Sequence, residues 1–545
     1  MKNKILPLTC FTISLSFLFT YSAITQAAEV NSAWSYWGAT KAFNRYSPAA
    51  QIDAESVSEL KILWRRPAVD SSITSAYPDL RVSGNLRSTP ILIDGVLYAA
   101  NGVGLAEAFD PATGATLWVQ QPDAPTLESA RGRSTRGLEY WADGADSQLL
   151  VIRKGYLYAL DPASGEAIAS FGDAGRVSLI PAGSNSYSYN SGGPIVVNDV
   201  IVIAGTVDGA GDSGAKWGGV ASEDVRGYDV RSGELLWTFH AVPREGEFGY
   251  DTWENDSARE SGDLGAWCCL SADEDLGYVY VPFTAPTAAY YGGHRPGDNL
   301  YSNSLVAIDV TTGERVWHFQ FVHHSVWDYD PPAAPNLIDI VVDGRPIKAV
   351  AQITKQGFTF VFDRATGEPV WPIEERPVPQ SIVIGEQTAA TQPYPTKPPL
   401  FLTNGATEDD VIDFTPELRA QGLEIFRQYQ AGPLYTPPTP GDNIIRPGWS
   451  GGANWWGAAF DPDSGHLFVP SWAHFSLVHI NPPQDPASDL MIRPRVRNLT
   501  GPDGLPLFKP PYSQLVAFDM NAGEKLWGVP VGEGPRDHEA LQGLE

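Results

Sequence analysis

The sequence predicts an all-β protein folded as a β-propeller, and three observations support this prediction. One strand-and-turn pattern recurs along the chain, alternating apolar runs are joined in pairs by short turns, and helical periodicity is nearly absent. The recurring pattern is Asp-x-x-x-Gly followed by a large aromatic residue, and its six copies occupy 108–118, 159–171, 227–237, 307–317, 361–371 and 517–527. Units of this kind, in which a terminal ring wedges against the next unit, are typical of propellers.

The residue types of each copy explain its turn. The Asp carboxylate accepts backbone N–H groups and starts a tight turn, and the Gly supplies a positive φ. A looser copy at 459–469 is interpreted as an inner hairpin instead. The stretch 415–429 is the exception to the β pattern, because it has helical spacing and begins with Thr-Pro.

Composition and charge indicate a large buried core and disfavour some classes of binding partner. With 545 residues, 43% hydrophobic content and 17 tryptophans, the chain can bury a large core. The formal charge of −27 argues against nucleic acid and anionic membrane surfaces as partners. Proline-rich segments mark long loops at about 372–450, which we expect to lie over one mouth of the ring.

The N-terminus resembles an export signal. Lys2 and Lys4 precede an apolar run at 5–24, and small residues follow it. We therefore expect a signal peptide at 1–27, a single propeller domain at 28–545 and a periplasmic protein; an uncleaved anchor is the alternative. The sequence stops just after its last repeat, so we expect an incomplete last blade, with a complete seven-bladed ring as the alternative.

Cys268 and Cys269 are the only cysteines beyond the N-terminal segment. A Cys-x-x-Cys-His motif is absent, so no covalently attached haem is expected on this chain, and electrons would leave to a separate carrier. A bond between adjacent residues closes a strained ring that fits a strand poorly, so we expect two reduced thiols, with a disulfide as the alternative.

Acids set among aromatic residues stand out at Trp327-Asp328-Tyr329-Asp330, which follows two histidines. Ionised carboxylates in such surroundings need a cation or donor beside them. This cluster, VHHSVWDYD, together with RGLEYW, GAWCCLSADEDLGYVYVP and TKQGFTFVFDRATG, resembles the pyrroloquinoline quinone (PQQ)-dependent dehydrogenases, and most closely their glucose dehydrogenase branch. The resemblance covers the chain from Trp34 onward and implies an eight-bladed propeller whose aromatic repeats are Trp-docking motifs.

The resemblance also implies roles for individual residues. Asp328 matches the general base, and Lys355 matches the cation that contacts the quinone oxygens. Arg136 matches an arginine that holds a cofactor carboxylate, and Trp267 matches the ring that stacks on PQQ. The structural alternatives are a satisfied turn aspartate for Asp328, a solvated hairpin lysine for Lys355 and core or blade packing for Trp267. The remaining cofactor-binding candidates are Asn454 and Trp455.

The family pattern identifies only candidates for the metal ligands and for the residues of the substrate pocket. Members hold a hard cation, usually calcium, with oxygen ligands, and the candidates are Asp328 with Asp224 or Glu223. His323 and His324, which directly precede the base, are candidates for shaping the substrate pocket. In alcohol-oxidising members a bridge between adjacent cysteines covers PQQ just before the RG-x-x-YW motif, where this chain has no cysteine.

The function expected from this resemblance is oxidation of an aldose- or polyol-type hydroxyl to a carbonyl. Electrons would pass to ubiquinone or to a separate cytochrome c. One alternative is a PQQ-dependent dehydrogenase of simple alcohols, and another is a non-catalytic propeller scaffold of the kind that assists outer-membrane assembly.

Overall fold

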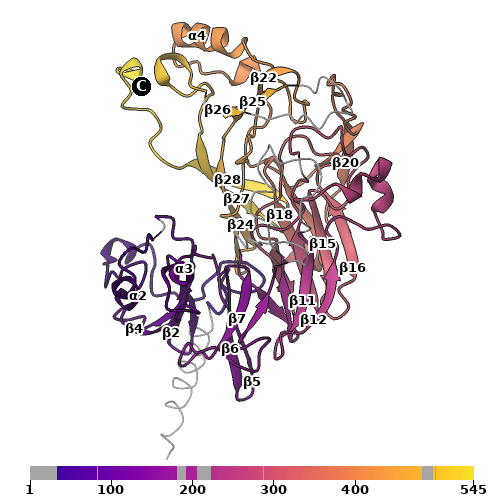
Figure 1. Cartoon of the computed structure of the whole chain (residues 1–545). Helices are drawn as coiled ribbons and strands as arrows, with labels where there is room; N and C mark the ends of the chain where they lie inside the picture. The colour runs from indigo at the N-terminus through magenta and orange to yellow at the C-terminus, as the bar shows by residue number, and fades with distance from the viewer. Residues whose placement is uncertain are drawn as a thin grey trace, which may run out of the picture.

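The protein is a set of small antiparallel sheets arranged as a curved fan. The structure, a computed structural model, describes residues 34–82, 84–180, 192–204, 223–286, 288–481, 495–497 and 499–544. Five of its sheets have four strands, two have three and one has two. Figure 1 shows them following one another from the indigo N-terminal sheet to the yellow C-terminal sheet.

Five sheets take their strands in chain order. Their strands are β1 (Ile91–Ile93), β2 (Val96–Ala100), β3 (Ala106–Phe109) and β4 (Thr116–Val119); β5 (Glu139–Asp143), β6 (Asp146–Arg153), β7 (Tyr156–Leu160) and β8 (Arg176–Ser178); β9 (Ile195–Val197), β10 (Val200–Ile203), β11 (Val225–Asp229) and β12 (Leu235–Phe239); β13 (Ser271–Asp273), β14 (Tyr278–Pro282), β15 (Ser304–Asp309) and β16 (Arg315–Gln320); β17 (Asn336–Val342), β18 (Arg345–Ile353) and β19 (Thr359–Asp363).

Of the other sheets, two include segments far apart in the chain, and the third is a two-stranded hairpin. They contain β23 (Ala459–Asp461), β24 (His466–Trp472), β27 (Ser513–Asp519) and β28 (Glu524–Pro530); β22 (Gly441–Ile445), β25 (Ser476–Ile480) and β26 (Arg495–Arg497); β20 (Ile373–Pro377) and β21 (Thr391–Pro395). The helices are α2 (Ser71–Ala76), α3 (Leu127–Ala130) and α4 (Pro416–Phe426), with short 3-10 helices at Val57–Glu59, Tyr250–Thr252, Glu254–Arg259, Glu408–Asp410, Pro502–Gly504 and Glu539–Leu541.

The first strands of successive sheets lie next to one another. β5 contacts β9, β9 contacts β13, β13 contacts β17, and β17 contacts β23. Each sheet therefore points outward from a shared centre, as the blades of a propeller do. The buried apolar residues fill the spaces between the sheets, as in the cluster that joins β9, β13 and β15.

The repeat aromatics connect one sheet to the next. The indole of Trp317 in β16 donates to the carbonyl oxygen of Arg364 in the next sheet's turn, at 3.1 Å, and its ring lies against Gly367. A Cβ on that glycine would clash with the ring, and its φ is +77°, so the position requires glycine for two reasons. Equivalent indole-to-carbonyl bonds join Trp64 to Pro111, Trp118 to Pro162 and Trp237 to Val310.

The predicted local elements at 415–429 and 459–469 are confirmed. Helix α4 begins after Thr415, whose hydroxyl accepts from the N–H of Leu418, and Pro416 occupies its first position. The looser repeat copy is the β23–β24 hairpin.

The long connection at 372–450 is more ordered than its proline content indicated. It forms the β20–β21 hairpin, α4 and β22; Figure 1 shows α4 and β22 at the top of the view and β20 below them on the right. Pro393 and Pro395 fit in β21 because a two-stranded sheet leaves one side of each strand without a ladder partner.

The expected signal peptide at 1–27 lies outside the described residues. Among the described residues, no helix combines the length and apolar character needed to cross a membrane.

Candidate active site

Several of the predicted site residues come together at one end of the fan of sheets because of where they lie in their sheets. Arg136, Trp267, Asp328 and Trp455 all precede the first strand of a sheet, namely β5, β13, β17 and β23. The first strands of neighbouring sheets lie side by side, so the segments that lead into them open on the same face. Lys355 reaches this face from the turn between β18 and β19.

Lys355 and two aspartates form the charged centre of the site. Its Nζ donates to the Asp328 backbone oxygen at 2.8 Å and lies 3.3 Å from Asp328 Oδ1. It also lies 3.0 Å from Asp330 Oδ2. The Lys355 side chain is 3% exposed, whereas the Asp328 side chain keeps 24% exposure. Of these charged groups, Asp328 is therefore the one that solvent or a substrate can reach best.

The two carboxylates are held differently. Asp330 Oδ1 accepts from the N–H of Ala285 at 2.7 Å, and its Oδ2 accepts from Trp267 Nε1 at 3.3 Å as well as from Lys355. Among the described residues, Asp328 Oδ2 makes one hydrogen-bond contact, a long one of 3.5 Å from the Tyr290 hydroxyl. Asp330 is thus a fixed counter-ion, and Asp328 retains capacity to accept another proton.

Two buried rings hold the segment that presents the acids. Trp327 donates to the carbonyl oxygen of Thr436 at 2.9 Å, and Tyr329 donates to that of Pro447 at 3.0 Å. Both rings are buried against the 372–450 connection. The aromatic residues thereby fix irregular backbone, in which Asp328 has a φ of +58°, and both aspartates contact Lys355.

The protein environment sets the charge states at this centre. Burial raises the pKa of Asp328 to about 7; the Lys355 ammonium opposes this rise and Asp330 adds to it. Burial alone would lower the pKa of Lys355, but Asp328 and Asp330 outweigh it and raise that pKa above its ordinary value. Lys355 therefore stays protonated at neutral pH, and Asp328 can gain or lose a proton there.

Arg136 and two indoles form the other half of the site. The Arg136 guanidinium is buried and lies 4.8 Å from the centroid of the Trp455 ring and 6.0 Å from that of Trp267. Asn454 orders the loop that carries Trp455, because its Oδ1 accepts from the Trp455 N–H at 2.7 Å and its Nδ2 donates to the Ser450 carbonyl at 2.7 Å. The Arg136 guanidinium therefore lies between two indole rings, beside the charged centre formed by Lys355 and the two aspartates.

Comparison with known proteins identifies the family. The β-propeller domain of PQQ-dependent glucose/ethanol/alcohol dehydrogenases matches residues 34–544. The chain belongs to this family.

Individual members of the family resemble the chain over most of its length. Quinoprotein glucose dehydrogenase A of Acinetobacter calcoaceticus is 30% identical, over 94% of this chain and 68% of that protein. The glycerol dehydrogenase large subunit of Gluconobacter oxydans (strain 621H) is 29% identical, over 93% of this chain and 72% of that protein. The crystal structure of quinohemoprotein alcohol dehydrogenase from Comamonas testosteroni shares the fold, with a TM-score of 0.65, 20% identity and coverage of 94% of this chain and 69% of that one.

The site residues fit the cofactor of this family. PQQ is a flat, aromatic polycarboxylate, and the site offers a buried guanidinium beside two indole rings together with a buried ammonium. The Thr135 hydroxyl, next to Arg136, is buried and has no hydrogen-bond partner among the described residues. A bound carboxylate or quinone would supply the acceptor that such a group requires.

The described residues do not assemble a metal site. Within them, no group of three or more His, Cys, Asp or Glu side chains could hold a metal ion. Asp224 accepts from the N–H of Ala241 at 3.1 Å and lies 3.8 Å from Arg244, and Glu223 is buried next to it. Asp328 is the one metal candidate that lies in the charged centre, where its neighbour is Lys355. No catalytic step is therefore derived through calcium.

The expectation of two reduced thiols was wrong, because the structure joins Cys268 to Cys269 in a disulfide. The pair lies in irregular backbone ahead of β13, whereas we expected a strand, in which adjacent side chains point to opposite faces. Its Cys268 Sγ lies 3.9 Å from the carbonyl oxygen of Trp455. The bridge thus follows Trp267 directly and contacts the loop of the second indole.

The two histidines anchor the long connection. His324 is buried between the Gly297 carbonyl, 2.7 Å from Nδ1, and Glu386 Oε1, 2.6 Å from Nε2. His323 Nε2 lies 3.1 Å from Glu375 Oε1 in β20. In the described part of the chain, neither histidine is hydrogen-bonded to Asp328 or Lys355, so their expected place in a substrate pocket stays a prediction.

The sequence reasoning missed Tyr290 and Glu386. Burial raises the pKa of Tyr290 well above its ordinary value, so the hydroxyl stays protonated and can donate to Asp328. Burial would raise the pKa of Glu386, but the bond from His324 outweighs it, so the pKa is lowered and the carboxylate is charged. No local pattern marks either residue, because each acquires its partner only through folding.

Proposed function

We propose that this PQQ-dependent dehydrogenase oxidises a hydroxyl group of a sugar or polyol to a carbonyl and passes two electrons to ubiquinone or a separate cytochrome c. One observation carries the proposal. It is the partly exposed Asp328, whose pKa lies near 7, hydrogen-bonded to the buried Lys355 beside the Arg136–indole group.

The roles of the residues follow from their contacts. Bound PQQ supplies the two-electron oxidant. Asp328 accepts the proton of the substrate hydroxyl, since a base with a pKa near neutrality is both ionised and basic enough to do so. Lys355 fixes Asp328 through its backbone and side-chain oxygens and provides positive charge where negative charge develops. Asp330 keeps Lys355 in place, and Arg136 would pair with a cofactor carboxylate.

The substrate class is supported by the relatives. Two of the most similar are a glucose dehydrogenase and a glycerol dehydrogenase, and both of these substrates carry several hydroxyl groups. Simple alcohols are the alternative, since quinohemoprotein alcohol dehydrogenase ADH IIB of Pseudomonas putida is 28% identical over 82% of the chain. A non-catalytic scaffold is not favoured, because it would have no use for Asp328, Lys355 and Arg136 at one mouth.

The proposal also covers the ring of sheets, the metal and the location of the protein. The indole bonds between successive sheets support Trp docking in an eight-bladed ring. Calcium, which the family pattern implies, stays a proposal, and Asp328 is its candidate ligand in the charged centre. A periplasmic location rests on the basic and apolar start of the sequence.

The experiment is reconstitution. The full chain without cofactor is mixed with PQQ and calcium, and dye reduction is followed with glucose, glycerol and ethanol. We expect PQQ-dependent reduction, faster with the polyhydroxylated substrates than with ethanol. Fastest turnover with ethanol would favour the alternative substrate class, and PQQ binding without turnover of any alcohol would contradict the enzymatic role.

A further inference from the structure

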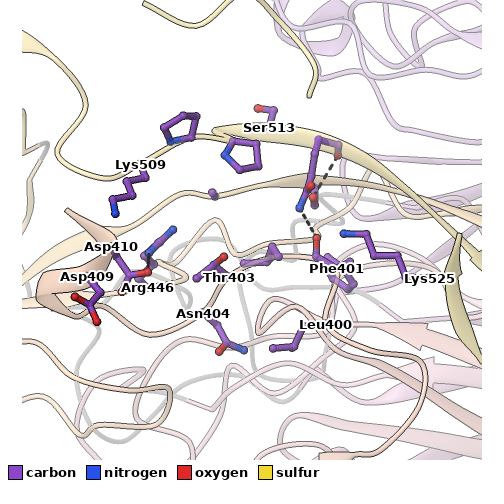
Figure 2. Close-up of a pocket in the computed structure, with 16 residues that line it drawn as sticks. Leu400, Phe401, Thr403, Asn404, Asp409, Asp410, Arg446, Lys509, Ser513 and Lys525 are labelled. Carbon is purple, nitrogen blue, oxygen red and sulfur yellow. Dashed lines mark hydrogen bonds and ion pairs between the residues drawn. The ribbon is translucent and has the colours of Figure 1, made fainter. Parts of the chain in front are cut away.

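A second cavity lies behind the Lys355 turn and contains none of the active-site residues. Its volume is about 610 Å³, and it is lined by the segment 400–404, the start of β27 and Lys525 of β28, among others. Figure 2 shows the side chains that surround it. Asn404 connects it to the site, since Nδ2 donates to the carbonyl oxygen of Gln356 at 2.9 Å. The volume is in the range of small-molecule sites.

Arg446 is the buried cation of this cavity. Its side chain is 4% exposed, and its Nη1 lies 3.2 Å from Asp410 Oδ1. Neither Nη1 nor Nε makes a hydrogen bond of good geometry within the described part of the chain. Asp410 is engaged elsewhere as well, because Oδ2 accepts from the Thr407 N–H at 2.8 Å and the Thr407 hydroxyl at 2.7 Å. Arg446 therefore has buried donors for which a ligand would supply the acceptor.

Two lysines add positive charge to the same cavity. Lys509 lies toward the Arg446 end and is paired with Asp413 at 2.7 Å, and Lys525 lies at the opposite end (Figure 2). Among the described residues, Lys525 has no ion-pair partner within 4 Å. Arg446 and Lys509 are paired with Asp410 and Asp413, and Asp409 also lines the cavity, so Lys525 supplies the positive charge that no described carboxylate pairs. It favours an anionic ligand over a cationic or neutral one.

The remaining lining indicates what carries the negative charge. Thr403, Asn404 and Ser513 line the cavity with hydroxyl and amide groups, and Leu400, which is exposed, adds an apolar surface. The planar guanidinium fork suits a carboxylate, which it can bind through two parallel hydrogen bonds. Asp409 also lines the cavity and disfavours a doubly charged phosphate more than a single carboxylate.

We propose that this cavity is a binding site for a hydroxylated organic carboxylate, a sugar acid in class. The carboxylate binds Arg446, the hydroxyl groups contact the polar side chains of the lining, and Lys525 contributes long-range attraction. The site is separate from the PQQ centre, and its existence does not depend on the proposed dehydrogenase activity.

The test is calorimetric titration of the full chain with D-gluconate, the uncharged D-glucitol and inorganic phosphate. We expect saturable gluconate binding that is at least about 10-fold tighter than glucitol or phosphate binding. R446Q and K525Q should each weaken it, R446Q by about 10- to 100-fold, the range for a lost charge-assisted hydrogen bond. R376Q, which removes a surface cation paired with Glu374 in β20, is the matched control and should leave it unchanged.

Two variants separate binding in this cavity from binding at the active site and from loss of the fold. D328N should bind gluconate as the wild type does, which separates this cavity from binding at the active site. Lys525 is exposed, so K525Q keeps the fold even if R446Q does not. The proposal would be overturned if gluconate did not bind, or if phosphate bound with equal strength. It would also be overturned if gluconate binding survived K525Q and any folded R446Q, or if it were lost in D328N.

Discussion

Removal of the Lys355 charge should move the pH dependence of the enzyme in a defined direction. Asp328 accepts a proton only when it is ionised, so activity falls as the pH drops through its pKa, which lies at about 7. The Lys355 ammonium holds that pKa below the value that burial alone would give. In K355Q the acidic limb of the pH profile should therefore move to higher pH.

The distance between the two charges sets the size of this shift. Asp328 Oδ1 and Lys355 Nζ are 3.3 Å apart. At an effective dielectric constant of about 20, unit charges at this distance interact by about 5 kcal/mol, which corresponds to a ceiling of about 4 pKa units. Measured shifts beside a single cation are about 1 to 3 units. The limb should thus move from about pH 7 to about pH 8–10, and at pH 7 the ionised fraction should fall from about one half to about one tenth or less.

The assay is kcat/KM for dye reduction between pH 5 and pH 10, at saturating PQQ, because this ratio reports the pKa of the free enzyme. K348Q in β18 is the matched control, since Lys348 is exposed and pairs with Asp275 at the surface, at 3.4 Å. A general loss of rate in K355Q without movement of the limb, or movement to lower pH, would refute the charge coupling between Lys355 and Asp328.

The remaining predictions concern Asp330, the cofactor clamp and the packing of the sheets. D330N removes a negative charge that raises the pKa of Asp328, so the acidic limb should move to lower pH, opposite to the effect of K355Q; a shift in the same direction would contradict this reasoning. R136K should weaken PQQ binding by about 10- to 100-fold in fluorescence titrations, because an ammonium cannot reproduce the guanidinium fork; unchanged affinity would remove Arg136 from the clamp. W317A should lower the free energy of unfolding in urea by about 3–5 kcal/mol, whereas W449A, at a residue 48% exposed, should change it little; equal effects would contradict the packing role of the repeat aromatics.

The repeat made the fold predictable from the sequence. Each copy specifies a turn, a strand and a ring that packs on the next copy, so local residue types also determine contacts between sheets. The same regularity brings the candidate residues together, because Arg136, Trp267 and Asp328 each precede the first strand of a sheet. The structure places these residues close together, and their assignment to a functional site stays a prediction.

Features that depend on partners distant in the chain were not predictable. Lys355 is shared between Asp328 and Asp330, but the sequence does not say that Asp330 is saturated by Ala285 and Trp267. The order within the 372–450 connection was missed because proline content signals a loop regardless of the tertiary contacts that fix it. The disulfide was missed because its conformation depends on where β13 begins.

The central claim is that Asp328 is the base of a PQQ-dependent dehydrogenase. The most direct measurement compares wild type and D328N for PQQ affinity and for kcat with the preferred sugar or polyol, in the same preparations. The account predicts that D328N binds PQQ about as tightly as the wild type and loses about 10²- to 10⁴-fold in kcat, the usual contribution of general-base catalysis. A D328N enzyme that binds PQQ and turns over at the wild-type rate would contradict it.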